Sequence, residues 1–358
     1  MKIIHCADLH INSALSYLPT EKAKIRREEI ISSFERLCSY AKNNQVKVVI
    51  IAGDFVDSEM ISEKVRSRVL FAISNCPETD FLYLSGNHDS DVFVNSEQSL
   101  PVNLKFFGVE WTHYVYGNVD VAGVCFNTVN NLSVYDTLNF SKENTNIAVM
   151  HGQVAGYKSE EKAEIISLPR LKDKNIDYLA LGHVHYFSEN QLDQRGRYAY
   201  SGCLDGRGFD ELGDKGFILL DVQENKINSS FISFSSRKFF EFEYDLTGKN
   251  SPFHVVDEII KCVKSQFDST SLVKVTLKGE VLPSFDIDKD GLESKLNSIF
   301  FFAKIKDKTT LKISEADYAL DKSVRGEFVR AVLSSNLEDE QKGKVIMCGL
   351  KALKGEEF

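Results

Sequence analysis

The sequence has 358 residues, of which 43% are hydrophobic and 27% charged, and its net charge is −9. This composition is typical of a globular protein with one or two domains and a sizeable core, and no apolar run is long enough to span a membrane. The acidic total argues against tight, independent binding of DNA. It excludes neither a phosphate substrate nor a basic partner.

The beginning of the chain reads directly as a strand, which leaves no room for a signal peptide. The seven cysteines are odd in number, scattered and without a Cys-x-x-Cys pair. Reduced thiols in a cytoplasmic protein are the natural interpretation of that pattern.

Strands and helices alternate over the first 235 residues and predict an α/β unit. The strands are apolar, often β-branched runs bounded by turn residues, and the helices have apolar residues at helical spacing. The predicted strands are 2–5, 46–51, 81–84, 119–124, 147–150, 178–181 and 217–221. The predicted helices are 21–44 and 62–74.

The pattern changes after about residue 235 and predicts a small, separate α+β domain, because strands and helices now follow in β-α-β-α-β order. These elements are a strand at 239–244, a helix at 252–267, a strand at 272–278, a helix at 288–299 and a strand at 303–313. Two helices, 322–335 and 338–354, end the chain. Their expected apolar faces are Val324, Phe328, Val332 and Leu333, then Val345, Ile346, Leu350 and Leu353. We therefore predict three parts: 1–235, 236–318 and 319–358.

Five short polar motifs each follow a predicted strand. They are Asp8-Leu9-His10, Gly53-Asp54-Phe55-Val56-Asp57, Gly86-Asn87-His88-Asp89, His151-Gly152 and Gly182-His183-Val184-His185. In layered α/β folds, ligands gather at the loops after the carboxyl ends of strands. Each motif alone has an ordinary alternative, such as a turn, a cap or a solvated histidine. Together they hold five of the eight histidines, whose burial is costly unless a partner such as a cation is present.

The donor chemistry of the motifs indicates the kind of metal. Carboxylates, an amide oxygen and imidazoles suit manganese, iron or zinc, and the lack of a thiolate argues against a structural zinc site. We expect two divalent metal ions, manganese foremost, with iron or zinc as alternatives.

The five motifs, in this order, resemble those of the calcineurin-like metallophosphoesterases. The resemblance implies a four-layer αββα sandwich with a two-metal centre that hydrolyses phosphoesters. The first metal would be held by Asp8, His10, Asp54 and His185. The second would be held by Asp54, Asn87, His151 and His183.

The same resemblance implies a catalytic role for two further residues. His88 would not bind metal but would protonate the leaving oxygen or stabilise the transition state, with Asp89 beside it. Asp57 and Asp89 are expected to support the centre from outside the ligand shell.

The segment after the fifth motif bears on the substrate. Its runs Tyr200-Ser201-Gly202-Cys203, Gly208-Phe209-Asp210-Glu211 and Lys215-Gly216-Phe217 are similar to those of SbcD/YhaO-type DNA repair exonucleases, the YhaO type most closely. The closing run Cys348-Gly349-Leu350-Lys351-Ala352-Leu353 is similar as well. The alternative is a glycine-rich turn that only returns the chain to the sheet.

This second resemblance implies a manganese-dependent DNA exonuclease, with endonuclease activity on single strands as a further option. It also implies that 236–318 caps the catalytic domain and binds DNA, and that 319–358 docks on an SbcC-like coiled-coil ATPase. Relatives pair as homodimers through helices of the catalytic domain, so a homodimer is a further expectation.

Other functions stay open on the sequence alone, because fold does not fix function. A small-molecule or phosphoprotein phosphoesterase would fit the acidic charge. A scaffold that tethers an ATPase to DNA ends would leave the ligand set idle. Arg195, Arg197 and Arg207 are candidates for phosphate contacts, although exposed arginines are usually just solvated.

Overall fold

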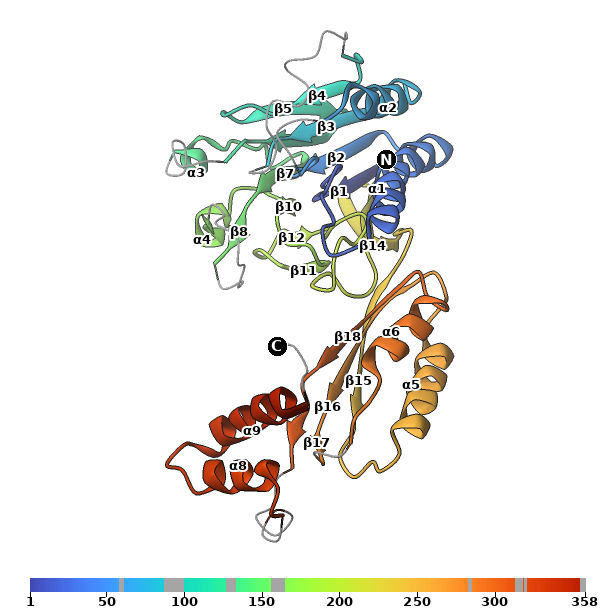
Figure 1. The fold of residues 1–358 in the computed structure, drawn as a ribbon. Helices are drawn as coiled ribbons and strands as arrows, with labels where there is room; N and C mark the ends of the chain where they lie inside the picture. Colours follow the sequence, from blue (N-terminus) through green and yellow to red (C-terminus); the bar gives the residue numbers. More distant parts are fainter. Residues whose placement is uncertain are drawn as a thin grey trace. The chain divides into compact units, whose positions relative to one another are not determined.

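The structure is a computed structural model that describes residues 1–57, 61–86, 100–126, 133–155, 165–282, 285–312, 318 and 321–354. The chain divides into two compact units, Met1–Lys238 and Phe239–Phe358, which are described separately (Figure 1). Within the described ranges, no helix is both long and apolar enough to cross a membrane.

The first sheet of unit 1 has six strands in the order β14-β13-β1-β2-β3-β4. Their bounds are β1 (Lys2–Cys6), β2 (Val48–Ala52), β3 (Asp80–Leu84), β4 (Leu104–Phe106), β13 (Gly216–Gln223) and β14 (Lys226–Ser233). Strands β1 to β4 are parallel, whereas β13 pairs antiparallel with β1 and β14 antiparallel with β13. The carboxyl ends of the parallel strands therefore lie at the same end of the sheet.

The second sheet has the order β11-β12-β10-β7-β6-β5. Its strands are β5 (Thr112–Tyr116), β6 (Val119–Gly123), β7 (Thr145–His151), β10 (Tyr178–Gly182), β11 (Ser188–Gln191) and β12 (Arg197–Tyr200). The four central strands are parallel and the two edge strands antiparallel. A short parallel pair, β8 (Gln153–Val154) and β9 (Ile165–Ile166), comes between β7 and β10 in the sequence.

The two sheets of unit 1 pack face to face. One buried cluster joins Ile3, Val48 and Leu82 of the first sheet to Val121 and Ile147 of the second. Continuous apolar runs in β2, β7 and β10 fit strands that are buried on both faces, as parallel strands usually are.

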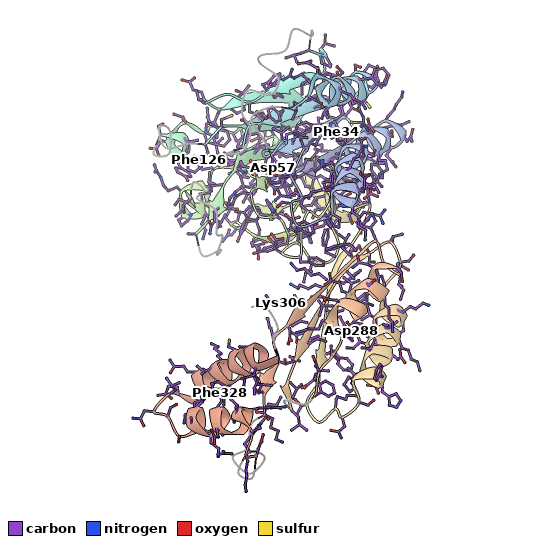
Figure 2. The ribbon with its side chains drawn as sticks, in the orientation of Figure 1. Phe34, Asp57, Phe126, Asp288, Lys306 and Phe328 are labelled. Atoms are coloured by element: carbon purple, nitrogen blue, oxygen red, sulfur yellow. The ribbon has the colours of Figure 1, made fainter. Side chains whose placement is uncertain are left out.

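Helices cover the outer faces of both sheets. Helices α1 (Thr20–Asn43) and α2 (Glu63–Ser74) belong to the first sheet, where the Phe34 ring lies 5.1 Å from Phe55 and 6.3 Å from Phe81, centroid to centroid (Figure 2). Helices α3 (Val134–Thr137) and α4 (Leu168–Leu171) share a buried cluster with the outer face of the second sheet. The expected four-layer αββα sandwich is therefore confirmed.

Unit 2 is built on a parallel sheet of β15 (Phe239–Asp245), β16 (Leu272–Lys278) and β18 (Phe302–Asp307). Helices α5 (Pro252–Gln266) and α6 (Lys289–Asn297) connect these strands, and both contribute to one buried cluster with the sheet. A short parallel pair, β17 (Glu280–Val281) and β19 (Thr310–Leu311), extends the unit. Helices α8 (Val324–Leu333) and α9 (Asp339–Lys354) form a pair with a small core of their own.

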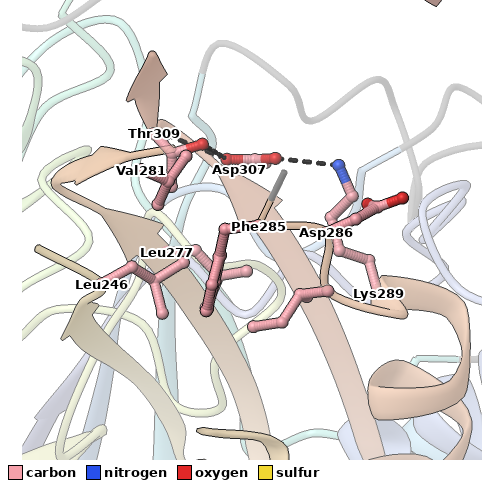
Figure 3. Close-up of a pocket in the computed structure, with 9 residues that line it drawn as sticks. Leu246, Leu277, Val281, Phe285, Asp286, Lys289, Asp307 and Thr309 are labelled. Atoms are coloured by element: carbon pink, nitrogen blue, oxygen red, sulfur yellow. Dashed lines mark hydrogen bonds and ion pairs between the residues drawn. The ribbon is translucent and has the colours of Figure 1, made fainter. Parts of the chain in front are cut away.

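One end of the unit 2 core encloses a small cavity of about 50 Å³, lined by Leu246, Leu277 and Phe285 among others (Figure 3). The Lys289 ammonium lies 2.8 Å from an Asp307 carboxylate oxygen at its rim. A water molecule takes up roughly 30 Å³ in the liquid, so this space is a packing feature rather than a site for an organic ligand.

One expectation for unit 2 is wrong and another holds only in part. The single strand predicted at 303–313 is divided, because the Asp307 carboxylate accepts hydrogen bonds from the Thr309 backbone (2.9 Å) and hydroxyl (2.7 Å) and turns the chain between β18 and β19. The apolar faces predicted for the last helices are right for Phe328, Val332, Leu333, Ile346 and Leu350, which are buried or partly buried in the core of this helix pair. They are wrong for Val324, which is 71% exposed, and they omit the buried Val329. Val345 and Leu353 are also exposed, at 40% and 51%. The three-part division at 235/236 and 318/319 stays a prediction.

A buried ion pair ties helix α1 to the segment after β12. The Arg26 guanidinium is fully buried and donates to Asp205 Oδ1 and to the Gly206 carbonyl, both at 2.7 Å. The other Asp205 oxygen accepts from Ser33 Oγ at 2.7 Å and from the Ser236 backbone at 3.0 Å. Because both charges are paired and hydrogen-bonded, removing one partner would leave the other buried without compensation.

We predict that Arg26→Met lowers the free energy of unfolding of unit 1 by about 3 kcal/mol or more, measured by urea denaturation. The matched control is Arg170→Met, because the ion pair of Arg170 with Asp136 is exposed and should contribute less than about 1 kcal/mol. Equal effects of the two substitutions would contradict the importance of the buried pair.

Candidate metal centre

The polar motifs of unit 1 lie where its parallel strands end. Asp8 and His10 follow β1, Asp54 follows β2, His151 closes β7 and His183 follows β10. Four of these five residues have positive backbone φ angles: 52° for Asp8, 44° for His10, 50° for Asp54 and 103° for His183. Such conformations are uncommon outside glycine and gather at functional sites, where the surrounding fold enforces them.

Six predicted ligands come together in two groups. The first group is Asp8, His10 and His185, and the second is Asp54, His151 and His183. In each group the candidate ligand atoms lie within 4.8 Å of one another. Asp54 Oδ2 also lies 3.8 Å from His10 Nε2 and 3.3 Å from His151 Nε2, so this carboxylate faces both groups.

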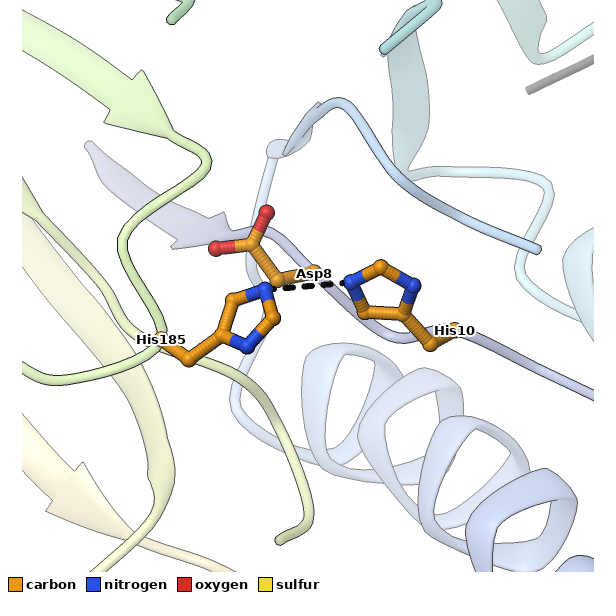
Figure 4. Close-up of side chains that lie close together, drawn as sticks. All are labelled: Asp8, His10 and His185. Atoms are coloured by element: carbon orange, nitrogen blue, oxygen red, sulfur yellow. Dashed lines mark hydrogen bonds between the residues drawn. The ribbon is translucent and has the colours of Figure 1, made fainter. Parts of the chain in front are cut away.

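In the first group, two imidazoles turn their Nε2 atoms toward each other. His10 Nδ1 lies 3.1 Å from Asp57 Oδ1, and His185 Nδ1 lies 2.8 Å from Glu211 Oε1. These carboxylates accept hydrogen bonds, so each Nδ1 carries a proton and each Nε2 presents a lone pair. The two Nε2 atoms are 3.2 Å apart (Figure 4). Lone pairs at that distance repel unless a cation or an added proton lies between them.

In the second group, a backbone carbonyl orients the histidine. His151 Nδ1 donates to the Ala52 carbonyl at 2.8 Å and leaves Nε2 facing Asp54 Oδ2. Burial disfavours the imidazolium, but the Asp54 carboxylate outweighs it and raises the pKa of His151 to about 9. Without metal, a proton therefore occupies the nitrogen that would bind one.

The residues present fit divalent cations. Asp8 Oδ2 is buried and finds no hydrogen-bond partner among the described residues, while Asp8 Oδ1 accepts from the His183 backbone at 2.9 Å. A buried carboxylate oxygen without a partner is costly unless a cation compensates it. The oxygen and imidazole donors suit manganese, iron or zinc.

Glycines in the motifs allow the two sheets to approach closely at the centre. A Cβ atom at Gly182 would lie 1.9 Å from the Ala52 carbonyl oxygen and 2.8 Å from His151 Nδ1. A Cβ atom at Gly53 would lie 2.1 Å from the same nitrogen. Any side chain at either position would displace the hydrogen bond that orients His151.

Two residues support the first group in a way that was not predicted from the sequence, which gave Glu211 no role and made Arg207 a candidate for phosphate contact. Glu211 is buried, and Arg207 donates to its Oε1 from Nη2 at 3.0 Å and to its Oε2 from the backbone at 2.6 Å. Burial opposes ionisation of Glu211, but the hydrogen bond with His185 and the Arg207 charge hold its pKa well below the usual range. The run that contains Glu211 was singled out only by family similarity, because no spacing pattern in the sequence connects Glu211 to His185.

None of the three candidate arginines is an unpaired cation. Arg195 lies 2.9 Å from Asp177, Arg197 lies 2.5 Å from Glu189 and Arg207 lies 3.0 Å from Glu211. Asn87, His88 and Asp89 lie outside the described residues, so their roles as ligand, proton donor and support stay predictions.

The His151 pKa predicts how metal binding depends on pH. Because the folded pKa lies above the ordinary value near 6.5, protonation of His151 stabilises the metal-free chain below that value, and this contribution is lost as the pH rises through about 9. Metal must displace the proton, so we expect manganese affinity to rise by up to about tenfold per pH unit between about pH 6.5 and about pH 8.5. Calorimetric titration measures the affinity. His113→Ala, outside the centre, should keep the slope, and a flat profile for the unsubstituted chain would contradict the prediction.

Comparison with known proteins places this geometry in a family. Residues 1–187 match the calcineurin-like phosphoesterase model. The DNA double-strand break repair protein Mre11 of Sulfolobus acidocaldarius is 23% identical over 319 residues, covering 84% of this chain and 79% of that protein. The metallophosphoesterase YhaO of Bacillus subtilis is 23% identical over 245 residues, covering 64% and 60%. Against Mre11 of Methanosarcina acetivorans, at 21% identity, the match spans 91% of this chain but about half (55%) of the relative.

Among solved structures, a dimetal phosphatase from Danio rerio is 9% identical and covers 66% of this chain and 99% of its own, with a TM-score of 0.40. That score is too low to add to the assignment. The family model, however, spans 187 of the 358 residues, more than half of the sequence. The chain belongs to the calcineurin-like phosphoesterase family.

Proposed function

We propose that this chain is a two-metal phosphodiesterase that hydrolyses DNA as an exonuclease, with endonuclease activity on single strands as part of the same proposal. The observation that carries it is the pair of ligand groups facing one shared carboxylate, Asp54. The family relation supports phosphoester hydrolysis. The Mre11 relatives, which are DNA double-strand break repair proteins, support DNA as the substrate.

In this proposal Asp8, His10, Asp54 and His185 hold one metal, and Asp54, Asn87, His151 and His183 hold the other. Manganese is our first choice, with iron or zinc as alternatives. When bound, two such ions would activate a water and neutralise charge on the phosphoryl oxygens. The chain orients the imidazoles of His10, His185 and His151 through Asp57, Glu211 and the Ala52 carbonyl. His88, which Asp89 follows in the sequence, would protonate the leaving oxygen or stabilise the transition state.

The proposed partners are DNA and an SbcC-like coiled-coil ATPase. The small core of α8 and α9, with Val324 and Leu353 exposed at 71% and 51%, supports an ATPase-docking role for 319–358. We propose that 236–318 caps the catalytic domain, and that homodimers form through catalytic-domain helices. All seven cysteines are free thiols, which supports a cytoplasmic location.

A second candidate is a phosphoesterase acting on small molecules or phosphoproteins. The net charge of −9 favours it, as does the pairing of all three candidate arginines with carboxylates. A free-standing DNA-binding protein would usually present unpaired basic residues in a stripe.

The decisive measurement is degradation of end-labelled linear DNA by the full chain with manganese, alone and with an SbcC-like ATPase. We expect Asp54→Asn to lower the rate at least about a hundredfold, because metal affinity and activity both depend on the ligand shell. His88→Ala should lower it by about 10² to 10⁴, the usual contribution of a general acid. Asp136→Asn, an exposed carboxylate outside the centre, is the matched control and should keep the full rate.

Each other outcome points to a different function. Inert DNA together with rapid turnover of phosphomonoesters or phosphopeptides would favour the second candidate. Failure of the full chain to bind manganese, iron or zinc would remove the metal centre itself and revive a scaffold role.

A further inference from the structure

Arg207 contacts two carboxylates at once. Its Nη2 and Nε lie 3.0 Å and 3.2 Å from Glu211 Oε1, and its Nη1 lies 3.4 Å from Asp57 Oδ1. A planar guanidinium donates in several fixed directions, so it can set the spacing of two acceptors in a way that a point charge cannot.

Each of these carboxylates holds a different histidine of the first group. Asp57 accepts from His10 at 3.1 Å, and Glu211 accepts from His185 at 2.8 Å. Arg207 Nη2 also lies 3.1 Å from His185 Nδ1. That nitrogen already needs its proton for Glu211, so the Arg207 donor is directed to the carboxylate. The Arg207 guanidinium thus links Asp57 and Glu211, the two carboxylates that orient His10 and His185.

The position of Arg207 is itself fixed by its backbone. Its N–H donates to Glu211 Oε2 at 2.6 Å, its carbonyl accepts from the Tyr17 hydroxyl at 2.6 Å, and the preceding Gly206 carbonyl accepts from the buried Arg26. The Arg207 side chain is only 17% exposed. These contacts commit the guanidinium to the protein interior rather than to a phosphate of the substrate.

The second group has a different support. Its His151 is oriented through Nδ1 by a backbone carbonyl, that of Ala52, and not by Asp57 or Glu211, the carboxylates that Arg207 contacts. Any dependence of metal binding on Arg207 should therefore be confined to the first group.

We propose that Arg207 is a positioning residue that holds His10 and His185 at the separation required for the first metal, acting through Asp57 and Glu211. This inference rests on the two-metal centre of the proposed function, but not on DNA as the substrate. Without the Arg207 guanidinium, Glu211 loses its charged donor while remaining buried, and the imidazoles of His10 and His185 can rotate independently. Loss of such outer support typically costs about 10- to 100-fold in metal affinity.

The test measures manganese affinity by calorimetry in two backgrounds that each remove one group. In His183→Ala only the first group is intact, and adding Arg207→Met should weaken binding about 10- to 100-fold. In His185→Ala only the second group is intact, and adding Arg207→Met should change the affinity less than about twofold, within ordinary scatter for an uncoupled site.

A lysine variant separates geometry from charge. Arg207→Lys keeps the positive charge but cannot donate to both carboxylates in fixed directions, so it should weaken the first group as Arg207→Met does. Full restoration of affinity by lysine would overturn the proposal that Arg207 acts by donating to both carboxylates in fixed directions. Unchanged binding in Arg207→Met would overturn the positioning role, because the arginine would then have no effect on affinity. Tighter binding would overturn it as well, because the arginine would then mainly repel the cation.

Controls keep folding and function apart from this result. Arg197→Met removes an exposed, ion-paired arginine of the same unit and should leave both affinities unchanged. Thermal melting of each metal-free variant reports folding, and if Arg207→Met does not fold, Glu211→Gln carries the same expectation for the first group. If the unsubstituted chain bound no manganese, the result would contradict the proposed metal centre itself, independently of the role of Arg207.

Discussion

The hydrogen bond from His151 Nδ1 to the Ala52 carbonyl, 2.8 Å long, is the contact on which the candidate site depends. It joins the end of β7 in the second sheet to the end of β2 in the first. The residue after Ala52 is Gly53 and the strand beside β7 ends at Gly182, and neither position has room for a Cβ atom. Two layers of a sandwich can share ligands only where their backbones come this close.

Burial alone does not make a histidine a ligand, as His5 shows. It is fully buried on β1 beneath the centre, and its Nδ1 accepts from the Tyr178 hydroxyl at 3.0 Å while its Nε2 lies 3.2 Å from the Leu181 carbonyl. Burial lowers the pKa of His5 to about 3, so it stays neutral with both nitrogens satisfied. His10, His185 and His151 differ because their Nε2 atoms face carboxylates or one another.

The apolar runs and the polar motifs that follow them predicted an α/β unit and most of its parallel strands, whereas the four-layer αββα arrangement was implied by the family resemblance. Those patterns missed the edge strands β4, β5, β11 and β14 and the parallel strand β12. The edge strand β14, for example, is rich in serine and lacks a continuous apolar run. They also misplaced Val324 of α8, which is exposed, and omitted Val329, which is buried with Ile346 and Leu350 of α9. The ligand candidates follow from local motifs, whereas Glu211 and Arg207 acquire their roles only through tertiary contacts with His185 and Asp57.

The order of the ligands along the chain has a consequence for biosynthesis. The first group joins Asp8 and His10 to His185, and β13, which pairs with β1, begins at Gly216. During synthesis β1 can pair early with β2, but its other neighbour, β13, and its ligand partner His185 exist only after most of unit 1 has been translated. Pairings of such long sequence separation form late and slowly. The first motif is therefore translated long before His185, and the first ligand group is complete only after the sandwich has closed.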